Sequence, residues 1–306
     1  MRRVIVILVA VLGTGVAGGL LDGIVWPGTA LALFRPQLTL VLLVATVAAL
    51  ALGPRWVGIA GLGLAVLGVA LLVPALTDPR PEPPIDDRPV VRVLALNLWA
   101  RNDDVDAVSR LIERERPDVV ALSELTPAWA SALAPVLREH RVRATAPGSE
   151  TSGIGLYGRG PLRGAVVVRV PPGGRPAVEG RIALPDGRTA WLLVTHPPSA
   201  LLPGDQGAHE EALSAIGGWA RAHGSSVVVC GDLNAPAWTR SLRRALAAGD
   251  LRALLPGGLV AGSWPALPPP LRISIDGCLV GRGVRARAEL GPRVGSDHLP
   301  VLVELA

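Results

Sequence analysis

The sequence predicts an α/β domain that follows a membrane anchor of three transmembrane helices. Three observations predict this organisation: long uncharged apolar stretches near the N-terminus, a proline-rich segment after them, and then apolar strand-like runs that alternate with helical patterns. We expect the membrane anchor over residues 1–76, a linker over 77–90 and one globular domain over 91–306, which is long enough to bury a core.

The membrane anchor is predicted from stretches that lack charge for about the length that a bilayer core requires. They are Val4–Leu21, Gln37–Gly53 and Trp56–Leu76. Arg2 and Arg3 before the first stretch and Arg55 between the second and third favour the cytoplasm for these ends, whereas Arg35 favours the opposite. Three crossings then predict a multi-pass protein of the plasma membrane with an extracytoplasmic domain. A two-span arrangement would reverse the side of the domain, and a cleaved signal peptide fits poorly because two more apolar stretches follow.

The charge balance of the domain disfavours a dedicated nucleic-acid binder. The whole chain has a formal net charge of +5, but residues 77–306 hold 26 Arg against 24 acidic side chains. Aromatic residues make up 3% of the chain, so few rings could stack on bases. Nucleic acid therefore remains a partner that the composition permits without favouring it.

Cysteine usage points to neither a disulfide scaffold nor a cysteine-rich zinc site. The chain contains Cys230 and Cys278, each within an apolar strand-like run. Because cysteine is among the residues most often fully buried, we expect two buried free thiols, with a disulfide between them as the alternative.

Polar side chains follow the first two strand-like runs of the domain. Val90–Leu96 ends at Asn97, and Val119–Leu122 is followed by Glu124. Between them, Asn102 could cap a helix, because the apolar positions after it share one helical face. Since strand ends present reactive side chains on a rigid scaffold, we expect Asn97 and Glu124 to be neighbours across two paired strands.

The same pattern recurs towards the C-terminus, with a polar residue after each apolar run. Ala190–Val194 is followed by His196, Val227–Cys230 by Asp232 and Asn234, and Ile273–Ile275 by Asp276, while Ser296-Asp297-His298 precedes a last strand over Val301–Glu304. Core packing alone does not produce Asn, Glu, His or Asp at the end of so many strands. We therefore take these residues as candidates for one functional site.

In this order, the motifs LNLW, LSEL, THPP, GDLN, SIDG and SDHLP resemble the endonuclease/exonuclease/phosphatase superfamily, over residues 91–306. Ser263-Trp264-Pro265 resembles a segment of membrane-anchored members linked to glycopeptide (teicoplanin and vancomycin) resistance. The resemblance implies a four-layer α/β/β/α sandwich, with two sheets packed face to face and helices outside. It also implies in-line hydrolysis of a phosphoester by an activated water, assisted by Mg²⁺ or Mn²⁺.

The resemblance assigns a metal-binding role to Asn97, Glu124 and Asp297. The chemistry of the side chains agrees, because Glu124 supplies a hard anionic oxygen and Asn97 a neutral one. Such a set suits a cation that keeps several waters and binds phosphate oxygen.

The resemblance also assigns catalytic roles to the remaining candidates. Asp232 would orient or deprotonate the attacking water, and Asn234 would hold the phosphate and that water. His298, paired with Asp276, would stabilise the pentacoordinate phosphorane or donate a proton, and His196 would hydrogen-bond a non-bridging phosphate oxygen. Many nuclease members have a carboxylate that supports the first histidine, and none can be assigned here.

Several other polar residues are expected to lie outside the site. His140, His209 and His223 are interpreted as surface or helix residues. The acidic residues near the predicted helices are interpreted as solvated charges and not as ligands.

The leading hypothesis for function is a membrane-anchored phosphatase or phosphodiesterase that acts at the outer face, with a lipid-linked pyrophosphate as a candidate substrate. It rests on the anchor and on the family resemblance. A surface endonuclease or exonuclease is the first alternative, and a non-catalytic membrane protein that keeps the fold as a binding module is the second.

Overall fold

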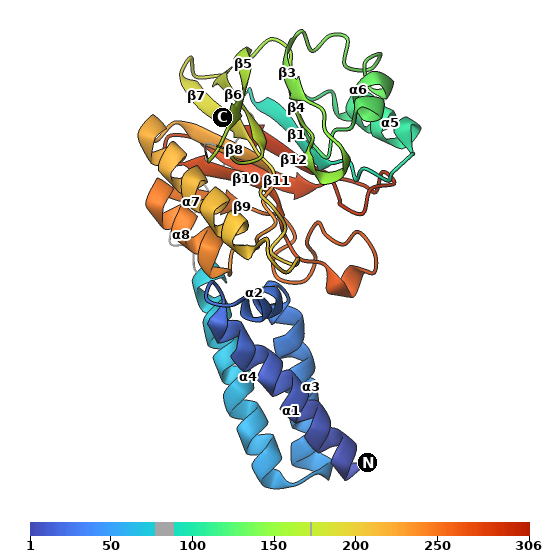
Figure 1. Cartoon of the computed structure of the whole chain (residues 1–306), viewed down its shortest axis with the longest axis vertical. Helices are drawn as coiled ribbons and strands as arrows, with labels where there is room; N and C mark the ends of the chain where they lie inside the picture. The colour runs from blue at the N-terminus through green and yellow to red at the C-terminus, as the bar shows by residue number, and fades with distance from the viewer. Residues whose placement is uncertain (77–88, 172) are drawn as a thin grey trace.

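The computed structural model describes residues 1–76, 89–171 and 173–306, and it shows a bundle of helices that projects from an α/β domain (Figure 1). The prediction of a linker over 77–90 falls almost wholly outside the described residues. The predicted α/β class and the three apolar N-terminal helices are confirmed.

The bundle contains three helices that are long and apolar enough to cross a membrane and one short helix. They are α1 (Arg2–Gly18), α2 (Trp26–Leu33), α3 (Arg35–Leu52) and α4 (Arg55–Leu76), and α2 is the short one. Large apolar side chains cover the outer face of the bundle: Val4 is 66% exposed and Val44 is 65% exposed. A soluble protein rarely exposes so large an apolar surface, whereas a bilayer core would cover it.

The domain contains two mixed sheets of six strands each. In the order in which neighbours are hydrogen-bonded, the first consists of β11 (Ala286–Leu290), β12 (Val301–Leu305), β1 (Val91–Asn97), β2 (Val119–Ser123), β4 (Ile154–Gly158) and β3 (Val142–Ala146). The second consists of β5 (Leu162–Arg169), β6 (Pro176–Ala183), β7 (Thr189–Val194), β8 (Val227–Asp232), β10 (Asp276–Gly281) and β9 (Leu251–Leu254).

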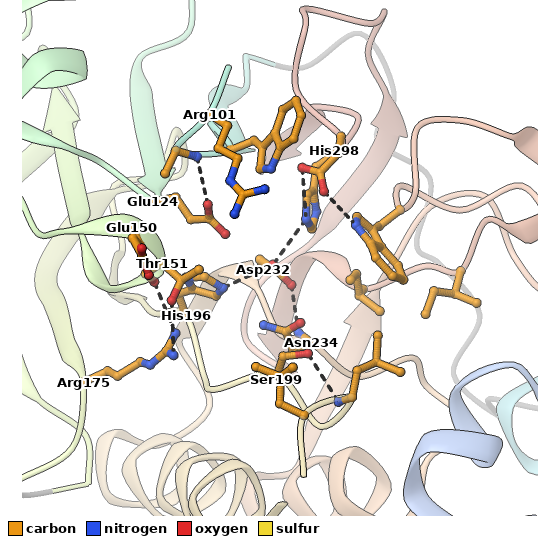
Figure 2. A pocket seen from close by; sticks show the side chains of 18 of the residues that line it. Arg101, Glu124, Glu150, Thr151, Arg175, His196, Ser199, Asp232, Asn234 and His298 are labelled. Atoms are coloured by element: carbon orange, nitrogen blue, oxygen red, sulfur yellow. Dashed lines mark hydrogen bonds and ion pairs between the residues drawn. The ribbon is translucent and has the colours of Figure 1, made fainter. Parts of the chain in front are cut away.

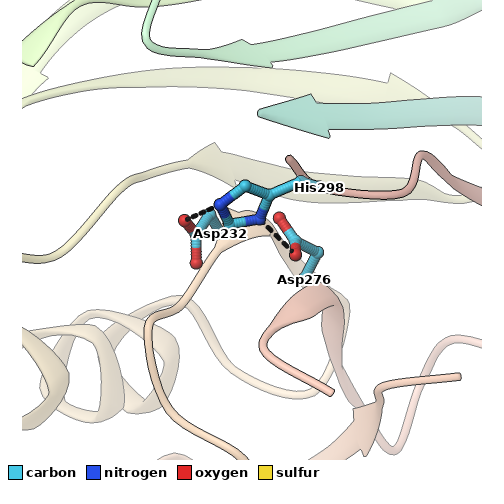
Figure 3. Close-up of side chains that lie close together, drawn as sticks. All are labelled: Asp232, Asp276 and His298. Atoms are coloured by element: carbon cyan, nitrogen blue, oxygen red, sulfur yellow. Dashed lines mark hydrogen bonds and ion pairs between the residues drawn. The ribbon is translucent and has the colours of Figure 1, made fainter. Parts of the chain in front are cut away.

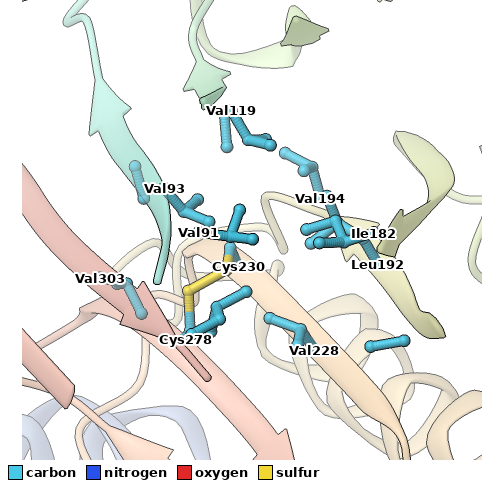
Figure 4. Packing of buried hydrophobic residues seen from close by; sticks show 14 of the residues in the cluster. Val91, Val93, Val119, Ile182, Leu192, Val194, Val228, Cys230, Cys278 and Val303 are labelled. Carbon is cyan, nitrogen blue, oxygen red and sulfur yellow. A yellow bond between two sulfur atoms is a disulfide. The ribbon is translucent and has the colours of Figure 1, made fainter. Parts of the chain in front are cut away.

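The two sheets pack face to face with helices on both outer faces, which confirms the predicted four-layer sandwich (Figure 1). The layer between the sheets is built from small and β-branched side chains such as Val93, Val119 and Val228 (Figure 4). Helices α5 (Val105–Glu115) and α6 (Pro127–Ala132) cover the first sheet. Helices α7 (Gln206–His223) and α8 (Arg240–Gly249) cover the second.

Two local predictions were wrong. Asp104, not Asn102, caps α5, because its Oδ1 accepts the amide hydrogen of Ala107 at 2.9 Å. The Asn102 amide is buried and instead donates to the carbonyls of Leu98 and Val294, each at 3.2 Å. It therefore ties a loop near the site to the rest of the domain.

The predicted strand over Ile273–Ile275 is also absent from the described sheets. Ile273 makes a single isolated bridge with Trp264, and Asp276 begins β10 instead of following a strand. Because β10 runs antiparallel to β8, the start of one and the end of the other meet at the same edge, and Asp276 lies directly opposite Asp232. Asp276 therefore lies beside Asp232 because it begins a strand, and not because it follows one.

The expectation of free thiols was wrong, since Cys230 and Cys278 form a disulfide (Figure 4). The two residues are directly opposed in the β8–β10 pair, so the strand register brings them together. Sequence spacing could not show this pairing, because it depends on two strands that are 48 residues apart.

The domain-facing end of the bundle is joined to the domain by direct hydrogen bonds. Arg35 is buried and donates from Nη1 to the carbonyl of Trp238 at 3.1 Å, and Gln37 donates to the carbonyl of Arg272 at 2.8 Å. In return, the backbone N–H of Arg240 donates to Asp22 Oδ2 at 2.7 Å. The bundle is therefore docked on the domain and is more than a tether.

Candidate active site

The first part of the site is built where β1 and β2 end. These strands are parallel, and Asn97 pairs in register with Ser123, which precedes Glu124. Asn97 Nδ2 donates to Glu124 Oε1 at 3.1 Å and to Asp232 Oδ2 at 3.0 Å. The backbone N–H of Ala100 donates to Glu124 Oε2 at 2.9 Å. The structure thus brings Asn97 and Glu124 together and joins them to the second sheet.

The imidazole of His298 lies between two buried carboxylates (Figure 3). His298 Nδ1 is 2.8 Å from Asp276 Oδ2, and His298 Nε2 is 3.8 Å from Asp232 Oδ2. The two carboxylates come from the opposed positions of β8 and β10. Ser296 Oγ accepts the amide hydrogen of His298 at 3.0 Å and donates to the carbonyl of Asn97 at 2.7 Å. The loop that carries His298 is therefore fixed to β1.

Electrostatics keep this histidine charged and the facing aspartate ionised. Burial would lower the pKa of His298, but the carboxylates of Asp276 and Asp232 outweigh it and raise the pKa to about 10. Burial would likewise raise the pKa of Asp232, but the charge of His298 and the hydrogen bond from His196 bring it well below its usual range. At neutral pH the site therefore holds an imidazolium beside an ionised carboxylate.

His196 and Asn234 flank Asp232 on its other side. His196 Nε2 lies 3.3 Å from Asp232 Oδ2, and the backbone N–H of Asn234 donates to Asp232 Oδ1 at 2.9 Å. Asn234 Nδ2 donates to the carbonyl of Pro197 at 3.0 Å. Within the described part of the chain, the buried Nδ1 of His196 has no hydrogen-bond partner, in keeping with the carboxylate that could not be assigned from sequence.

Asp297 lies beyond His298. Its Oδ2 accepts a hydrogen bond from Trp264 Nε1 at 3.1 Å, and its Oδ1 is 3.9 Å from His298 Nε2. Among the described residues, that Oδ1 is buried and finds no hydrogen-bond partner. An unpartnered carboxylate oxygen in this position is suited to a cation or to a donor on a substrate.

One cavity of about 300 Å³ is lined by six of the candidate site residues: Glu124, His196, Asp232, Asn234, Asp297 and His298 (Figure 2). Asn97 and Asp276 lie behind this lining and contact it through Glu124, Asp232 and His298. Glu124, His196, Asp232 and His298 form its charged wall and point toward one another (Figure 2). The lining also includes apolar side chains from separate segments, which we call the apolar wall: Leu33, Leu201, Leu202, Ile273 and Ile275. Leu33 belongs to α2, so the N-terminal helical bundle contributes to the lining of the cavity.

Sequence reasoning missed several lining residues. Arg101 and Arg175 line the cavity, and Figure 2 shows the Arg101 guanidinium extended toward Glu124. A basic residue a few positions after Asn97 was a usable signal for Arg101. Leu33 carried no such signal, because an apolar residue within an apolar segment has nothing in sequence to distinguish it.

The donor set fits a hard divalent cation. Glu124 and Asp297 both offer carboxylate oxygens to the cavity. Asn97 Oδ1 accepts the amide hydrogen of Trp99 at 2.9 Å, so its nitrogen faces the carboxylates, and a half-turn of the amide would present the oxygen. One buried trio in the described chain, Asp232, Asp276 and His298, also has ligand atoms within 4.8 Å of one another. We interpret that trio as a hydrogen-bonded relay and not as a metal site, because His298 Nδ1 and Asp276 Oδ2 are already hydrogen-bonded to each other at 2.8 Å.

The other histidines lie outside the cavity lining. His140 is buried, contrary to the expectation of a surface or helix position, and its Nε2 is 3.0 Å from the carbonyl of Pro117. His209 is buried on α7, and its Nδ1 lies 2.8 Å from the carbonyl of Pro198, so it supports the loop after His196. His223 ends α7 and packs against Trp191 and Trp219.

Comparison with known proteins agrees with this fold. The model of the Endonuclease/Exonuclease/phosphatase family matches residues 94–298. No curated protein matches the chain.

Three solved structures illustrate the likeness. The D. rerio TDP2 complexed with single strand DNA product is 14% identical, with a TM-score of 0.56 over 72% of this chain and 100% of its own. The human Nocturnin catalytic domain with bound sulfate anion is 17% identical, with a TM-score of 0.56 over 72% and 96%. Sphingomyelinase C from Streptomyces griseocarneus is 18% identical, with a TM-score of 0.50 over 71% and 99%. The chain therefore belongs to the endonuclease/exonuclease/phosphatase family and is a hydrolase of phosphoester bonds.

Proposed function

We propose that this chain is a divalent-metal-dependent phosphoesterase, anchored in the plasma membrane, that hydrolyses a phosphoester or pyrophosphate carried on a membrane lipid. One observation carries the proposal: the lining of a single cavity contains both the charged cluster and the apolar wall. Part of the apolar wall, Leu33, comes from α2, the short helix that lies in sequence between two of the helices long and apolar enough to cross a membrane. A phosphate attached to an apolar chain matches both walls, whereas a free phosphate matches one.

The residues of the charged wall can carry out in-line hydrolysis. Asp232 is ionised and is held by Asn97, His196 and Asn234, so it can orient a water and accept its proton. The His298 imidazolium can stabilise charge on the phosphorane or protonate the leaving group, a contribution of roughly 10²–10⁴-fold in rate.

Glu124, Asn97 and Asp297 are the residues that would hold Mg²⁺ or Mn²⁺. When bound, such an ion neutralises charge on the phosphate oxygens. The orphaned Oδ1 of Asp297 and the position of Glu124 beside Asn97 support this assignment.

The disulfide supports the assignment of the domain to the outside of the cytoplasm. Disulfides persist in oxidising compartments and are rare in the cytosol. The Cys230–Cys278 bond therefore agrees with the arginine distribution of the anchor, which also favours an extracytoplasmic domain.

Activity on nucleic acid is the competing proposal. The D. rerio TDP2 relative was crystallised with a DNA product, and Arg101 and Arg175 line the cavity of this chain. The near-neutral charge of residues 77–306 and the apolar wall favour the lipid instead.

The test uses the purified full chain in lipid nanodiscs with Mg²⁺. We expect phosphate release from a polyprenyl pyrophosphate, loss of release with EDTA, and a fall of at least 10²-fold in Asp232→Ala. Asp106→Ala, which removes an exposed carboxylate of α5, is the matched control and should leave the rate unchanged. Plasmid cleavage that falls steeply with salt, without release from the lipid, would favour the nuclease.

The resemblance of Ser263-Trp264-Pro265 to resistance-associated proteins adds a physiological proposal: the chain supports tolerance of glycopeptide antibiotics. Expression in a sensitive bacterium should raise the inhibitory concentration of teicoplanin, and Asp232→Ala should abolish the increase. An equal increase with Asp232→Ala would instead indicate a non-catalytic binding role.

A further inference from the structure

The segment Ser263-Trp264-Pro265 lies where the active-site cavity, the second sheet and the membrane helices meet, and the mechanism above gives it no role. Trp264 lines the cavity, and it belongs to the same apolar cluster as Leu33, Ile273 and Ile275. The side chains of Ser263 and Trp264 both make hydrogen bonds to residues of the catalytic cluster.

Ser263 fixes the two halves of the His298–Asp276 pair to each other. Its side chain is fully buried, and its Oγ accepts the amide hydrogens of Asp276 at 3.1 Å and of Ile275 at 3.3 Å. Its carbonyl accepts the amide hydrogen of Leu299, the residue after His298, at 2.9 Å. One serine thus holds the start of β10 and the loop that carries the histidine.

Trp264 holds Asp297 through its side chain. The indole Nε1 donates to Asp297 Oδ2 at 3.1 Å, which leaves the unpartnered Oδ1 facing His298. The indole lies 6.2 Å from the His298 ring, between centroids. Backbone hydrogen bonds in both directions with Ile273, at 3.1 and 2.6 Å, fix the tryptophan in place.

Phe34 brings the N-terminal helices next to the same indole. It lies between α2 and α3, and its ring centroid is 6.4 Å from that of Trp264. This spacing is within the range of tilted aromatic contacts. The next residue, Arg35, is buried and donates to Trp238 of the domain, so Phe34 is held at the docked end of the bundle.

We propose that Trp264 is a positioning residue that orients Asp297 for the metal and sets the place of His298, and that Phe34 holds Trp264 from the membrane side. The N-terminal helices are then a structural part of the active site. This inference rests on the proposed metal-binding role of Asp297 and is independent of which phosphoester is the substrate.

The test measures Mn²⁺ binding by calorimetry in the full chain in nanodiscs, without substrate, together with kcat and KM. Trp264→Phe keeps an aromatic ring at this position but removes the N–H that donates to Asp297. Mn²⁺ affinity should then fall by about 10–100-fold, which is the usual effect of removing a residue that hydrogen-bonds a metal ligand. Phe34→Ala should shift affinity and kcat in the same direction, and Phe34→Leu should restore part of both by refilling the space. Val44→Ala, on the exposed face of α3, is the matched control.

Thermal unfolding of every variant separates positioning from loss of the fold. Trp264→Phe with unchanged Mn²⁺ affinity and kcat would overturn the role of Trp264. If Trp264→Phe lowers Mn²⁺ affinity and kcat but Phe34→Ala leaves both unchanged, the coupling to the membrane helices would be overturned. Absence of Mn²⁺ binding in the unmodified chain would overturn the metal assignment and this inference together. Intact Mn²⁺ binding without hydrolysis of the lipid would reject only the proposed substrate.

Discussion

The imidazole of His298 is buried between the carboxylates of Asp276 and Asp232. A buried imidazole alone would be neutral at pH 7, and the two carboxylates reverse this. Either charge would be costly to bury without the other, so each member of the pair stabilises the other in the folded protein.

Replacement of Asp276 by asparagine should lower the pKa of His298. The carboxylate of Asp276 is the strongest influence that raises this pKa, from 6.5 to about 10, and burial opposes it. The high-pH limb of kcat/KM should therefore fall near pH 10 in the unmodified chain and at a clearly lower pH in Asp276→Asn. A pH–rate profile measures the shift, and an unmoved limb would contradict the assignment of His298.

The His298–Asp276 pair also determines the direction in which the stability of the fold changes with pH. Because the folded-state pKa of His298 is raised, its stabilising contribution is complete below about pH 6.5 and is lost as the pH rises through about 10. In Asp276→Asn the alkaline loss of stability from this histidine should be smaller and should be complete at a lower pH, which thermal unfolding at a series of pH values would detect.

At the scale of the elements, β8 and β10 form the rigid part of the site. Their antiparallel register opposes Asp232 with Asp276 and, two residues further in, Cys230 with Cys278. The disulfide thus ties the two strands that carry the aspartates on either side of His298.

Removal of this disulfide should destabilise the domain. Cys230→Ala combined with Cys278→Ala removes the cross-link, and we expect the free energy of unfolding to fall by about 2–4 kcal/mol. Thermal unfolding of the variant and of the unmodified chain, both without reductant, measures the change. Two reactive thiols in the unmodified chain after unfolding under non-reducing conditions would show that the bond is absent.

The elements show where sequence reasoning succeeds. Asn97 and Glu124 were predicted to be neighbours from strand ends alone, because the runs before them are mostly β-branched and aliphatic. Asp276 was predicted to follow a strand that is absent from the described sheets. Ile273 and Ile275 are apolar because they line the cavity and pack in a cluster with residues of the N-terminal helices. Their apolar character indicated burial, and burial does not specify a strand. The disulfide and the wall residue Leu33 depend on tertiary register, which spacing does not encode.

At the scale of the whole molecule, the arginines of the bundle lie at its two ends. The N-terminus, with Arg2 and Arg3, and the turn between α3 and α4, with Arg55, lie at the end of the bundle far from the domain (Figure 1). Arg35, which argued against this orientation from sequence, lies at the domain end and donates to Trp238 and Gly19. It is an interface residue, so its charge is not a reliable indicator of membrane side.

Without Arg35, the remaining arginines favour a cytoplasmic far end, and we therefore predict an extracytoplasmic domain. A reporter fused after residue 306 should therefore be active as alkaline phosphatase, which requires export, and dark as a cytoplasmic fluorescent protein. Fusions after Gly53, at the far end of the bundle, should give the opposite pair of results. If the chain crossed the membrane only twice, the fusion after residue 306 would report the cytoplasm. That result would place the disulfide in a reducing compartment and remove the topological support for a substrate at the outer face.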